Sequence, residues 1–393
     1  MGKIWNQGVL ISHKRFVTLQ PMRIVYFFRS LALWGGIERI IVDKAGWLAG
    51  QEDCQVTIVT CDQGNHEVPY ALADGVALCD LDVGLHRQYR YRGWRRLWER
   101  WQLERLLAKR LRRKIAELQA DVVVCVATSY ADTVLRAVGD RVPVVVESHS
   151  IYCQMFGRGG IRGAYNDWRL QRQLKRARMV VTLTEDDARD WRRLLPEVRC
   201  IPNMVEQNPT GRMGDAATRR VIFVGRFDYQ KRAEMAIGLW QRVGPQHPDW
   251  QLHVYGDGER REAVAEAVRR VVGVTLHKPT ASIFDAYCDS AFLILTSLYE
   301  PFGLVMAEAM SCGLPVVAFD CPYGPQTIVE DGSNGFLVEE GDMQGFADSM
   351  SRLMDDDALC RRMGSTAVMT ARRFSANQVM PQWLTLFHEL TEA

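Results

Sequence analysis

The feature that most constrains the fold of this chain is a regular alternation of short, Val- and Ile-rich runs with longer amphipathic segments. Each short apolar run predicts a buried strand, and each amphipathic segment between two runs predicts a helix that crosses over a sheet. Strands joined by such crossovers run parallel to one another. We therefore expect an α/β protein built on parallel sheets with helices on both faces.

The expected strands fall into two groups, one in each half of the chain. The first group comprises residues 23–28, 55–60, 76–81, 121–126, 142–147 and 179–183, and the second comprises residues 220–224, 250–255, 274–277, 292–295, 316–319 and 335–338. Since 393 residues suffice for two ordinary domains, each group is expected to form its own sheet. The predicted fold class is thus two Rossmann-like, doubly wound α/β domains that face a central cleft.

Domain limits follow from the spacing of these groups. We predict an N-terminal extension at 1–21, a first domain at 22–200, a second domain at 201–375 and a C-terminal helix at 376–393 that returns to the first domain. The extension holds one short apolar patch and no small-residue cleavage site, which is atypical of a signal peptide. We therefore do not expect secretion.

Composition argues against several other classes of protein. No apolar stretch approaches the roughly 20 residues that a membrane-spanning helix needs, so an integral membrane protein is not expected. The ten cysteines include no Cys-x-x-Cys pair, which favours reduced thiols and gives no support to a structural zinc site. Residues 1–195 carry 31 Lys and Arg against 21 Asp and Glu, whereas residues 196–393 carry 18 against 26. Two halves of opposite net charge are expected to have different roles.

The first motif that carries chemistry is a pair of cations after the first strand of the second half. Gly225 ends the strand, Arg226 follows it, and Lys231 stands five residues later, ahead of a helix expected from about Arg232. A guanidinium grips two oxygens in a fork and an ammonium supplies a point charge, so the pair suits a diphosphate. A solvated basic loop is the alternative.

The second motif places two glutamates around an expected helix N-terminus. Pro301 suits a first helical turn, which would leave the next three backbone amides free to receive hydroxyls or an anion. These amides belong to Phe302, Gly303 and Leu304. Glu300 would stand at the mouth of the site and Glu308 two turns further along, a spacing that can hold successive polyol groups of one ligand. A helix with one N-terminal and one surface glutamate is the alternative.

In their order and spacing these motifs resemble the retaining glycosyltransferases of family 4. The resemblance rests on the Gly-Arg with its downstream Lys, on Glu-Pro-Phe-Gly-Leu-Val-Met-Ala-Glu at 300–308, on Gly-Leu-Pro-Val-Val-Ala at 313–318, and on Glu-Asp-Gly-Ser-Asn-Gly-Phe-Leu-Val at 330–338. The first half matches more thinly, through Gly-Gly-Ile-Glu at 35–38 and a histidine after the fifth strand. The family implies a two-domain fold called GT-B.

The resemblance implies donor-binding roles for the second half. Arg226 and Lys231 would hold the donor diphosphate and stabilise the leaving group. Glu300, with the amides of residues 302–304, would hold the transferred sugar, and Glu308 would bind the ribose. The second domain would therefore bind the nucleotide sugar, and the first would bind the acceptor.

The resemblance also implies three residues of the first half. Gly35 and Gly36 would let the backbone approach the phosphates, a role that only glycine fills at little cost. His149 would contact the donor sugar near the reacting carbon, and a satisfied histidine at a strand end is the alternative. With this histidine, the expected catalytic set also includes Arg226, Lys231 and Glu300 of the second half.

These groups indicate transfer without a cofactor. A leaving diphosphate can be stabilised electrostatically by cations and a helix terminus, so no metal is required. Family members retain the anomeric configuration and are usually assigned a same-face route, in which the leaving phosphate oxygen takes the proton of the acceptor. Uridine is the expected base on family frequency alone, because His277, Lys278 and Pro279 stand where family members often have glycine.

Residues 86–114 predict the acceptor environment. They hold twelve Lys and Arg against two Glu, and Trp94, Trp98 and Trp101 follow helical spacing on one face. The expected cations of this surface include Arg95, Arg96 and Arg105. An amphipathic helix rich in Trp and Arg suits an anionic lipid interface.

We therefore expect a lipid-linked or polysaccharide acceptor at the cytosolic face of the membrane, with the protein cytoplasmic and peripherally attached there. A solvated basic face packed on the sheet through its tryptophans is the alternative. Nucleic acid is not an expected partner, because the charge sits in one stretch of a chain whose other half carries a nucleotide-sugar motif.

Other functions stay open at this stage. Asp80 and Asp82 could bridge a divalent ion and a diphosphate, as in a metal-dependent transferase. Gly256 and Gly258 begin a weak dehydrogenase pattern, in which Arg261 replaces the third glycine. A nucleotide-sugar hydrolase or epimerase on the same fold, and a non-catalytic glycan- or lipid-binding scaffold, are the remaining alternatives.

Overall fold

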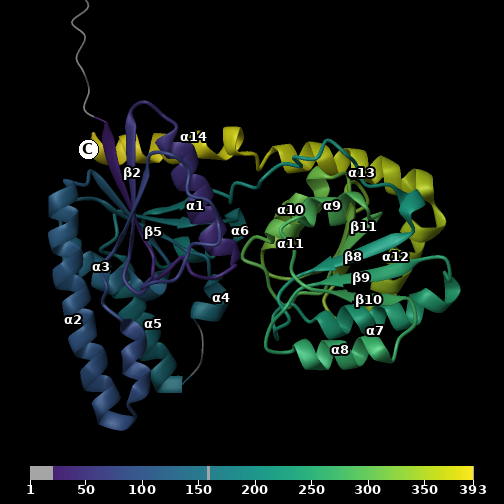
Figure 1. Cartoon of the computed structure of the whole chain (residues 1–393), viewed down its shortest axis with the longest axis horizontal. Helices are drawn as coiled ribbons and strands as arrows, with labels where there is room; N and C mark the ends of the chain where they lie inside the picture. The colour runs from purple at the N-terminus through teal and green to yellow at the C-terminus, as the bar shows by residue number, and fades with distance from the viewer. Residues whose placement is uncertain (1–20, 157–159, 393) are drawn as a thin grey trace, which may run out of the picture.

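The computed structural model describes residues 21–156 and 160–392, which form two lobes lying side by side (Figure 1). The predicted N-terminal extension therefore lies outside the described residues, apart from Pro21. Each lobe is built on one parallel sheet with helices on both faces. The predicted fold class is thus confirmed.

The sheet of the first lobe has seven strands in the order β3-β2-β1-β4-β5-β6-β7. They are β1 (Met22–Phe27), β2 (Cys54–Thr60), β3 (Val76–Asp80), β4 (Val122–Val126), β5 (Val144–Glu147), β6 (Met179–Thr182) and β7 (Val198–Cys200). The first six lie within two residues of the predicted ranges. The sequence pattern misses β7, a strand of three residues at the sheet edge, because so short a run shows no alternation.

Two helical layers bury this sheet on both faces. Its helices are α1 (Gly36–Ala49), α2 (Gly93–Leu118), α3 (Ala131–Val138), α4 (Tyr152–Met155), α5 (Gly160–Leu174) and α6 (Glu185–Arg192). Helix α1 packs on one face, whereas α2, α3 and α6 pack on the other. Strand β4 is buried at all five positions because both of its faces are covered, which explains its unbroken apolar sequence VVVCV.

The second lobe repeats this architecture with six parallel strands in the order β10-β9-β8-β11-β12-β13. The strands are β8 (Arg220–Val224), β9 (Gln251–Tyr255), β10 (Val274–His277), β11 (Phe292–Leu295), β12 (Val316–Asp320) and β13 (Gly335–Glu339). The helices are α7 (Ala233–Val243), α8 (Arg261–Arg269), α9 (Ile283–Cys288), α10 (Leu304–Ser311), α11 (Gly324–Ile328), α12 (Met343–Asp355) and α13 (Asp357–Arg372). Each strand of this sheet lies within one residue of its predicted range.

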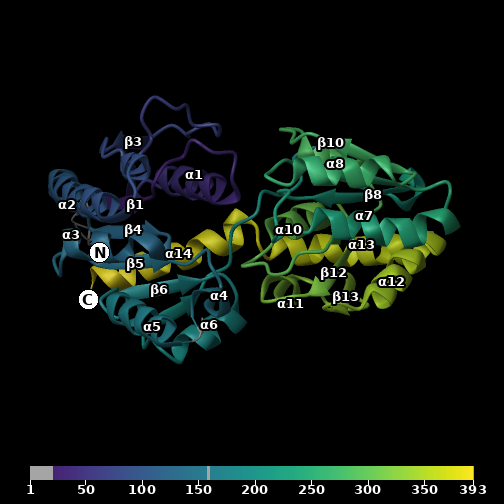
Figure 2. The same ribbon diagram turned by 90° about the horizontal axis from the view of Figure 1, so that it is seen from below.

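The last helix, α14 (Ala376–Thr391), crosses from the second lobe to the first (Figures 1 and 2). It packs on the same sheet face as α1, and Val379, Trp383 and Phe387 of α14 join the apolar core there. Within residues 21–156 and 160–392, no helix combines the length and the apolar character that crossing a bilayer requires.

Candidate functional site

The predicted donor residues of the two halves meet where the two lobes face each other. Gly36 begins α1 in the first lobe and Leu304 begins α10 in the second. A Cβ atom added to Gly36 would lie 3.2 Å from Cδ1 of Leu304, so the two helix N-termini are in close contact. A second contact between the lobes joins the Tyr323 hydroxyl to Asp190 at 2.6 Å.

Glu300 and Lys231 form the centre of the site on the second lobe. The Lys231 ammonium donates to Oε1 of Glu300 at 2.5 Å, and the Ser297 hydroxyl donates to the same oxygen at 2.6 Å. The Glu300 side chain is 3% exposed and the Lys231 side chain 14%. The loop between β11 and α10 is fixed to the cation loop, because the Leu298 amide donates to the Gln230 carbonyl at 2.8 Å.

Arg226 has different surroundings from Lys231. Its side chain is 70% exposed and pairs with Asp228 at 3.1 Å. Asp228 in turn accepts a hydrogen bond from the Lys231 amide at 2.9 Å, which shapes the loop between β8 and α7. Arg226 therefore presents a guanidinium that is mostly open to solvent, whereas the Lys231 ammonium is already paired with Glu300. Arg232 is engaged in another way, since its guanidinium bonds the carbonyls of residues 296 and 297.

The helix after Glu300 begins later than predicted. Pro301 does not lie in the first helical turn, because α10 starts at Leu304 and Gly303 adopts a left-handed φ of 91°. Two backbone hydrogen bonds explain the delay: the Glu300 amide donates to the Pro322 carbonyl at 2.8 Å, and the Gly324 amide donates to the Glu300 carbonyl at 2.9 Å. Glu300 is thereby bound to the loop after β12, and the left-handed Gly303 separates it from the helix.

Phe302 of this loop anchors it to the core. Its side chain is 2% exposed and lies edge-on to the ring of Phe374, with the ring centroids 5.1 Å apart. The predicted amides of residues 302–304 therefore belong to a well-packed loop followed by a helix start. Gly303 is needed there because its φ of 91° is a conformation that side chains strain to adopt.

Glu308 is buried and engaged by a residue that the sequence analysis did not select. Arg39 of α1 donates to its Oε1 atom at 3.0 Å, and the Tyr287 hydroxyl donates to Oε2 at 3.2 Å. Burial raises the pKa of Glu308, while Arg39 and the Tyr287 hydrogen bond lower it. Arg39 also pairs with Glu206 and lies 3.7 Å from Asp43. This acidic group around one arginine spans both lobes and the segment that joins them.

His149 lies just after β5, in the first lobe, with its side chain 6% exposed. The charges of His149 and Arg226, which come from different lobes, both act on the Glu38 carboxylate. Burial raises the pKa of Glu38, and its own amide, Arg226 and His149 oppose that rise. The same carboxylate lies against Gly35, where an added Cβ would be 2.0 Å from Oε2 of Glu38.

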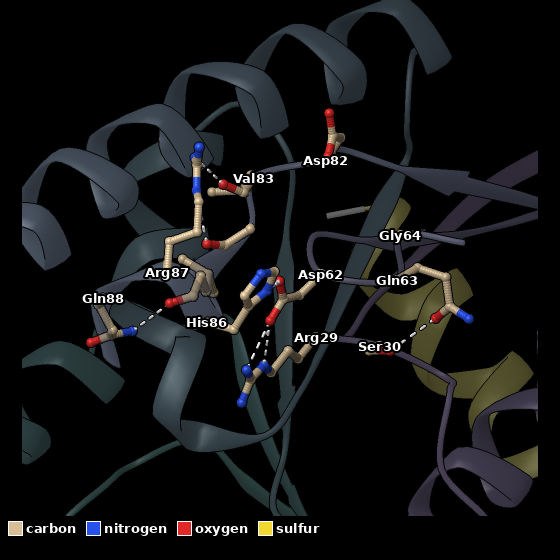
Figure 3. A network of polar contacts seen from close by, with 12 residues as sticks. Arg29, Ser30, Asp62, Gln63, Gly64, Asp82, Val83, His86, Arg87 and Gln88 are labelled. Carbon is tan, nitrogen blue, oxygen red and sulfur yellow. Dashed lines mark hydrogen bonds and ion pairs between the residues drawn. The ribbon is translucent and has the colours of Figure 1, made fainter. Parts of the chain in front are cut away.

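A polar network lies at the carboxyl ends of β1, β2 and β3 (Figure 3). Asp62, with a side chain 4% exposed, accepts hydrogen bonds from the Arg29 guanidinium at 2.8 and 3.1 Å. Its other carboxylate oxygen lies 2.6 Å from Nδ1 of His86. Since ligands of parallel sheets bind beyond the carboxyl ends of strands, this network lies at the edge expected for an acceptor.

The two aspartates of the Asp-x-Asp pattern have separate surroundings. Asp80 accepts hydrogen bonds from the Thr60 hydroxyl at 2.9 Å and the Gly64 amide at 3.1 Å, so it closes the loop after β2. Asp82 adopts a left-handed φ of 47° and lies apart from the Asp62 network in Figure 3. In the part of the chain that the structure describes, no three His, Cys, Asp or Glu side chains form a group that could hold a metal ion.

The two glycines of the weak dehydrogenase pattern have a packing role. A Cβ added to Gly256 would lie 2.0 Å from the Gly225 carbonyl, and one added to Gly258 would lie 2.5 Å from the Phe227 carbonyl. Both glycines therefore allow the loop after β9 to approach the loop that carries Arg226. Beside them, His277 stacks on Tyr255 with ring centroids 4.2 Å apart.

The basic, Trp-rich segment forms the exposed half of α2. Trp94, Trp98 and Trp101 are 72%, 54% and 52% exposed. The helix packs on the sheet instead through a later stripe formed by Leu103, Leu107, Leu111 and Ile115. The idea that the tryptophans pack on the sheet is therefore wrong, because this stripe of apolar residues at four-residue spacing fills that face.

The arginines of this surface lie over its aromatic rings. Arg95 lies 5.5 Å from the ring centroid of Trp94, and Arg105 lies 4.5 Å from that of Trp101. Arg96 lies 4.8 Å from the ring of Tyr89, which precedes the helix. The predicted surface thus presents stacked cations and rings to solvent.

Sequence reasoning did not select Glu38, Arg39, Lys44, Glu147 or Ser297 as site residues. Glu38 and Arg39 directly follow the glycine pair, which is a local signal that could have identified them. For Lys44 the signal is weaker: a lysine on the apolar stripe of an amphipathic helix. Their partners lie far away in sequence, so only the fold brings these residues together.

Two family models match successive parts of the chain. The model described as Glycosyltransferase Family 4 matches residues 34–208, and the model described as Glycosyl transferases group 1 matches residues 218–356. The first match covers the lobe with His149, and the second covers the loops with Arg226, Lys231 and Glu300.

Two curated relatives each match half of this chain or less. The exopolysaccharide phosphotransferase SCO2592 of Streptomyces coelicolor is 31% identical over 202 residues, which is 50% of this chain and 21% of that protein. The lipopolysaccharide 1,6-galactosyltransferase of Escherichia coli is 33% identical over 154 residues, 37% of this chain and 41% of that protein. The chain thus matches less than half the length of each of these two relatives.

The fold recurs in solved structures. A TarM mutant of S. aureus, in complex with Fondaparinux, alpha-GlcNAc-glycerol and UDP, superposes with a TM-score of 0.77 at 17% identity, covering 93% of this chain and 99% of that one. Anabaena HepE in complex with UDP and glucose has a TM-score of 0.70 at 19% identity, covering 94% and 100%. Consecutive family models of glycosyltransferases thus match both lobes, and the two matched ranges together make up most of the chain.

Proposed function

We propose that this protein is a retaining, metal-independent glycosyltransferase that moves a hexose or N-acetylhexosamine from a UDP-sugar to a lipid-linked or polysaccharide acceptor. The observation that carries the proposal is the Lys231–Glu300 pair, joined at 2.5 Å just ahead of α10, whose first residue Leu304 packs against Gly36 of the other lobe. This arrangement combines a cation for phosphate with a carboxylate for sugar hydroxyls. The matches of both lobes to glycosyltransferase family models support the reaction class.

The donor is proposed to bind on the second lobe. Arg226 and Lys231 would hold the diphosphate, Glu300 would accept hydrogen bonds from hydroxyls of the transferred sugar, and Glu308 would bind the ribose. Gly36 has no side chain, and a Cβ atom there would lie against Leu304. The space between the two helix N-termini is therefore left for the phosphates. UDP in the complexes of TarM and HepE supports uridine as the base.

The proposed reaction needs charge stabilisation above all. The bond between the anomeric carbon and the diphosphate oxygen breaks, and a bond from the acceptor hydroxyl oxygen to that carbon forms on the same face. The leaving phosphate oxygen takes the acceptor proton. Arg226 and Lys231 would stabilise the charge that develops on the leaving diphosphate, a contribution of several kcal/mol in comparable sites, about 3–4 per donor. His149 would contact the donor sugar near the reacting carbon.

The acceptor is proposed to approach along the first lobe at the inner face of the membrane. The three exposed tryptophans of α2 suit the headgroup region of a bilayer, and the arginines among them suit anionic lipids. Each cation near such a surface contributes about 1 kcal/mol. Relatives that act on poly(ribitol-phosphate) and lipopolysaccharide support an acceptor of this kind. We do not propose nucleic acid as a partner.

A thermal-shift screen tests the donor proposal directly. UDP, GDP, ADP and their common sugar conjugates are compared with and without EDTA, on the wild-type protein and on Arg226→Ala. We expect stabilisation by uridine nucleotides that survives EDTA and is lost in the variant. Binding that requires a metal would favour the metal-dependent alternative and contradict the proposal.

Product analysis separates the remaining alternatives. Incubation of the bound nucleotide sugar with a lipid-linked glycan fraction should yield acceptor-linked sugar with the donor's anomeric configuration. Free sugar or an epimerised donor alone would indicate a hydrolase or an epimerase. Unchanged biological function in Arg226→Ala and Glu300→Ala would indicate a non-catalytic scaffold.

A further inference from the structure

A buried ion pair lies directly beside His149 in the first lobe. Lys44 of α1 donates from Nζ to Oε1 of Glu147, the last residue of β5, and the two side chains are 0% and 1% exposed. Lys44 stands on the sheet-facing stripe of α1, where Ile41 and Leu48 on the neighbouring turns are apolar and buried. A charged residue at this position departs from the pattern that buries the rest of the helix.

The C-terminal helix closes the pair off from solvent. The Lys44 ammonium lies 4.1 Å from the ring centroid of Trp383, a fully buried residue of α14. A cation over the face of an indole is attracted electrostatically. Helix α14 reaches this place only after the chain has passed through the whole second lobe (Figure 2), so three segments distant in sequence enclose the pair.

Glu147 connects the pair to the candidate site. Its Oε1 atom lies 3.2 Å from Nε2 of His149. Burial by itself would raise the pKa of Glu147, but Lys44 and His149 outweigh burial and hold this pKa at about 2. The carboxylate is therefore ionised at neutral pH. Nε2 of His149 has no hydrogen-bond partner among the described residues, and the ionised Glu147 carboxylate at 3.2 Å is a charged group close enough to attract it.

Stability alone does not account for charges at this position. Removing two ions from water is costly, and apolar side chains of similar volume in place of a buried ion pair are often neutral or stabilising. The face of the sheet that α1 and α14 cover is an apolar core that would accept such side chains. The closeness of the carboxylate to His149 gives a different reason for the pair.

We propose that Lys44 and Glu147 are positioning residues that hold the imidazole of His149 in one orientation toward the donor sugar. This inference rests on the proposed function, because it deepens the role assigned there to His149. Lys44 anchors the carboxylate, the carboxylate orients the ring, and Trp383 keeps water from the pair. Displacing a reacting group by 1 Å can cost about 10²-fold in rate, which is the loss that such an anchor prevents.

The decisive variant is the double substitution Lys44→Met and Glu147→Met, which removes both charges and leaves neither unpaired. We expect it to fold with a thermal midpoint close to that of the wild type. Its Kd for UDP should change less than about twofold, because the side chains proposed to bind the diphosphate and the ribose lie on the other lobe. Its kcat for sugar transfer to the lipid-linked glycan fraction should fall roughly tenfold to hundredfold, with KM for the nucleotide sugar nearly unchanged.

Phe387→Leu serves as the matched control, since it changes the same apolar core and leaves Lys44, Glu147 and Trp383 in place. It should retain nearly the wild-type kcat. Wild-type kcat in the double variant would overturn the proposal. A parallel loss of kcat and UDP affinity would overturn it too, because that pattern indicates a general structural role.

A spectroscopic readout makes the test independent of the proposed reaction. In protein with isotope-labelled histidine, the imidazole signals of His149, assigned with His149→Gln, should shift or broaden in the double variant. Unchanged signals would contradict a positioning role even in a protein that binds no nucleotide. Failure of the wild-type protein to bind UDP would refute the proposed donor, and the histidine signals would still decide the positioning role.

Discussion

Replacing Arg226 or Lys231 by alanine should separate donor binding from folding, because the two cations of one loop have different surroundings. The Arg226 side chain is 70% exposed, whereas the Lys231 side chain is 14% exposed and its partner Glu300 is 3% exposed. Both substitutions remove a charge from the proposed diphosphate site. Only the second leaves a buried carboxylate without its cation.

The magnitudes follow from this difference. Arg226→Ala should change the free energy of unfolding by less than about 0.5 kcal/mol, as is usual for exposed residues. Breaking a buried pair costs about 3–5 kcal/mol, which the partial exposure of Lys231 reduces to roughly 2–3 kcal/mol for Lys231→Ala. A charged hydrogen bond to phosphate is worth about 1.5–3 kcal/mol, so each variant should bind UDP roughly tenfold to 150-fold more weakly.

Urea denaturation and calorimetric titration with UDP measure the two effects. Arg269→Ala is the matched control for Arg226→Ala, since Arg269 is 69% exposed on α8. The double variant Lys231→Ala, Glu300→Gln should regain most of the lost stability without regaining UDP affinity, because no unpaired charge is left. UDP binding by Arg226→Ala at wild-type affinity would refute the diphosphate assignment, and wild-type stability of Lys231→Ala would refute the cost assigned to the pair.

Four further predictions concern other parts of the molecule. Replacing Trp94, Trp98 and Trp101 by serine should release the protein from anionic vesicles, and undiminished flotation would contradict an interfacial helix. Burial, with neighbouring cations, lowers the pKa of His253 to about 4, so the unfolded chain binds an extra proton between about pH 4 and 6.5. The free energy of unfolding should therefore rise with pH across this window, by about 1–2 kcal/mol after allowance for half-exposure, and urea titrations of His253→Phe should lack this rise. Glu308→Gln should weaken the binding of UDP more than the binding of inorganic pyrophosphate, because pyrophosphate has no ribose for Glu308 to contact. Equal losses of affinity for the two ligands would argue against that contact. Donor binding should draw the lobes together, so scattering curves that saturating UDP leaves unchanged would count against closure.

The strands and the fold class could be predicted because their signals are local. A strand buried on both faces must be apolar along its length, and a crossover helix must be amphipathic. Each element can therefore be recognised from a short stretch of sequence. The exceptions have physical reasons. Strand β7 has only three residues, and α10 starts late because backbone hydrogen bonds from Glu300 hold its first residues in a loop.

The candidate site could be predicted only in part. Arg226, Lys231, Glu300 and Glu308 belong to compact motifs whose spacing is visible along the chain. Their assigned roles stay predictions. No sequence motif predicts that Arg39 pairs with Glu308, because the two residues are 269 positions apart and their pairing depends on how the lobes meet.

The sequence by itself therefore determined two parallel sheets, their order along the chain and the loops that carry charge, since these depend on periodicity and on residues a few positions apart. Tertiary structure alone decided that α2 buries its leucines and exposes its tryptophans. It also decided that Lys44, Glu147 and Trp383 share one buried site. The physical reason is that burial and charge pairing are properties of the assembled surfaces, which no local pattern specifies.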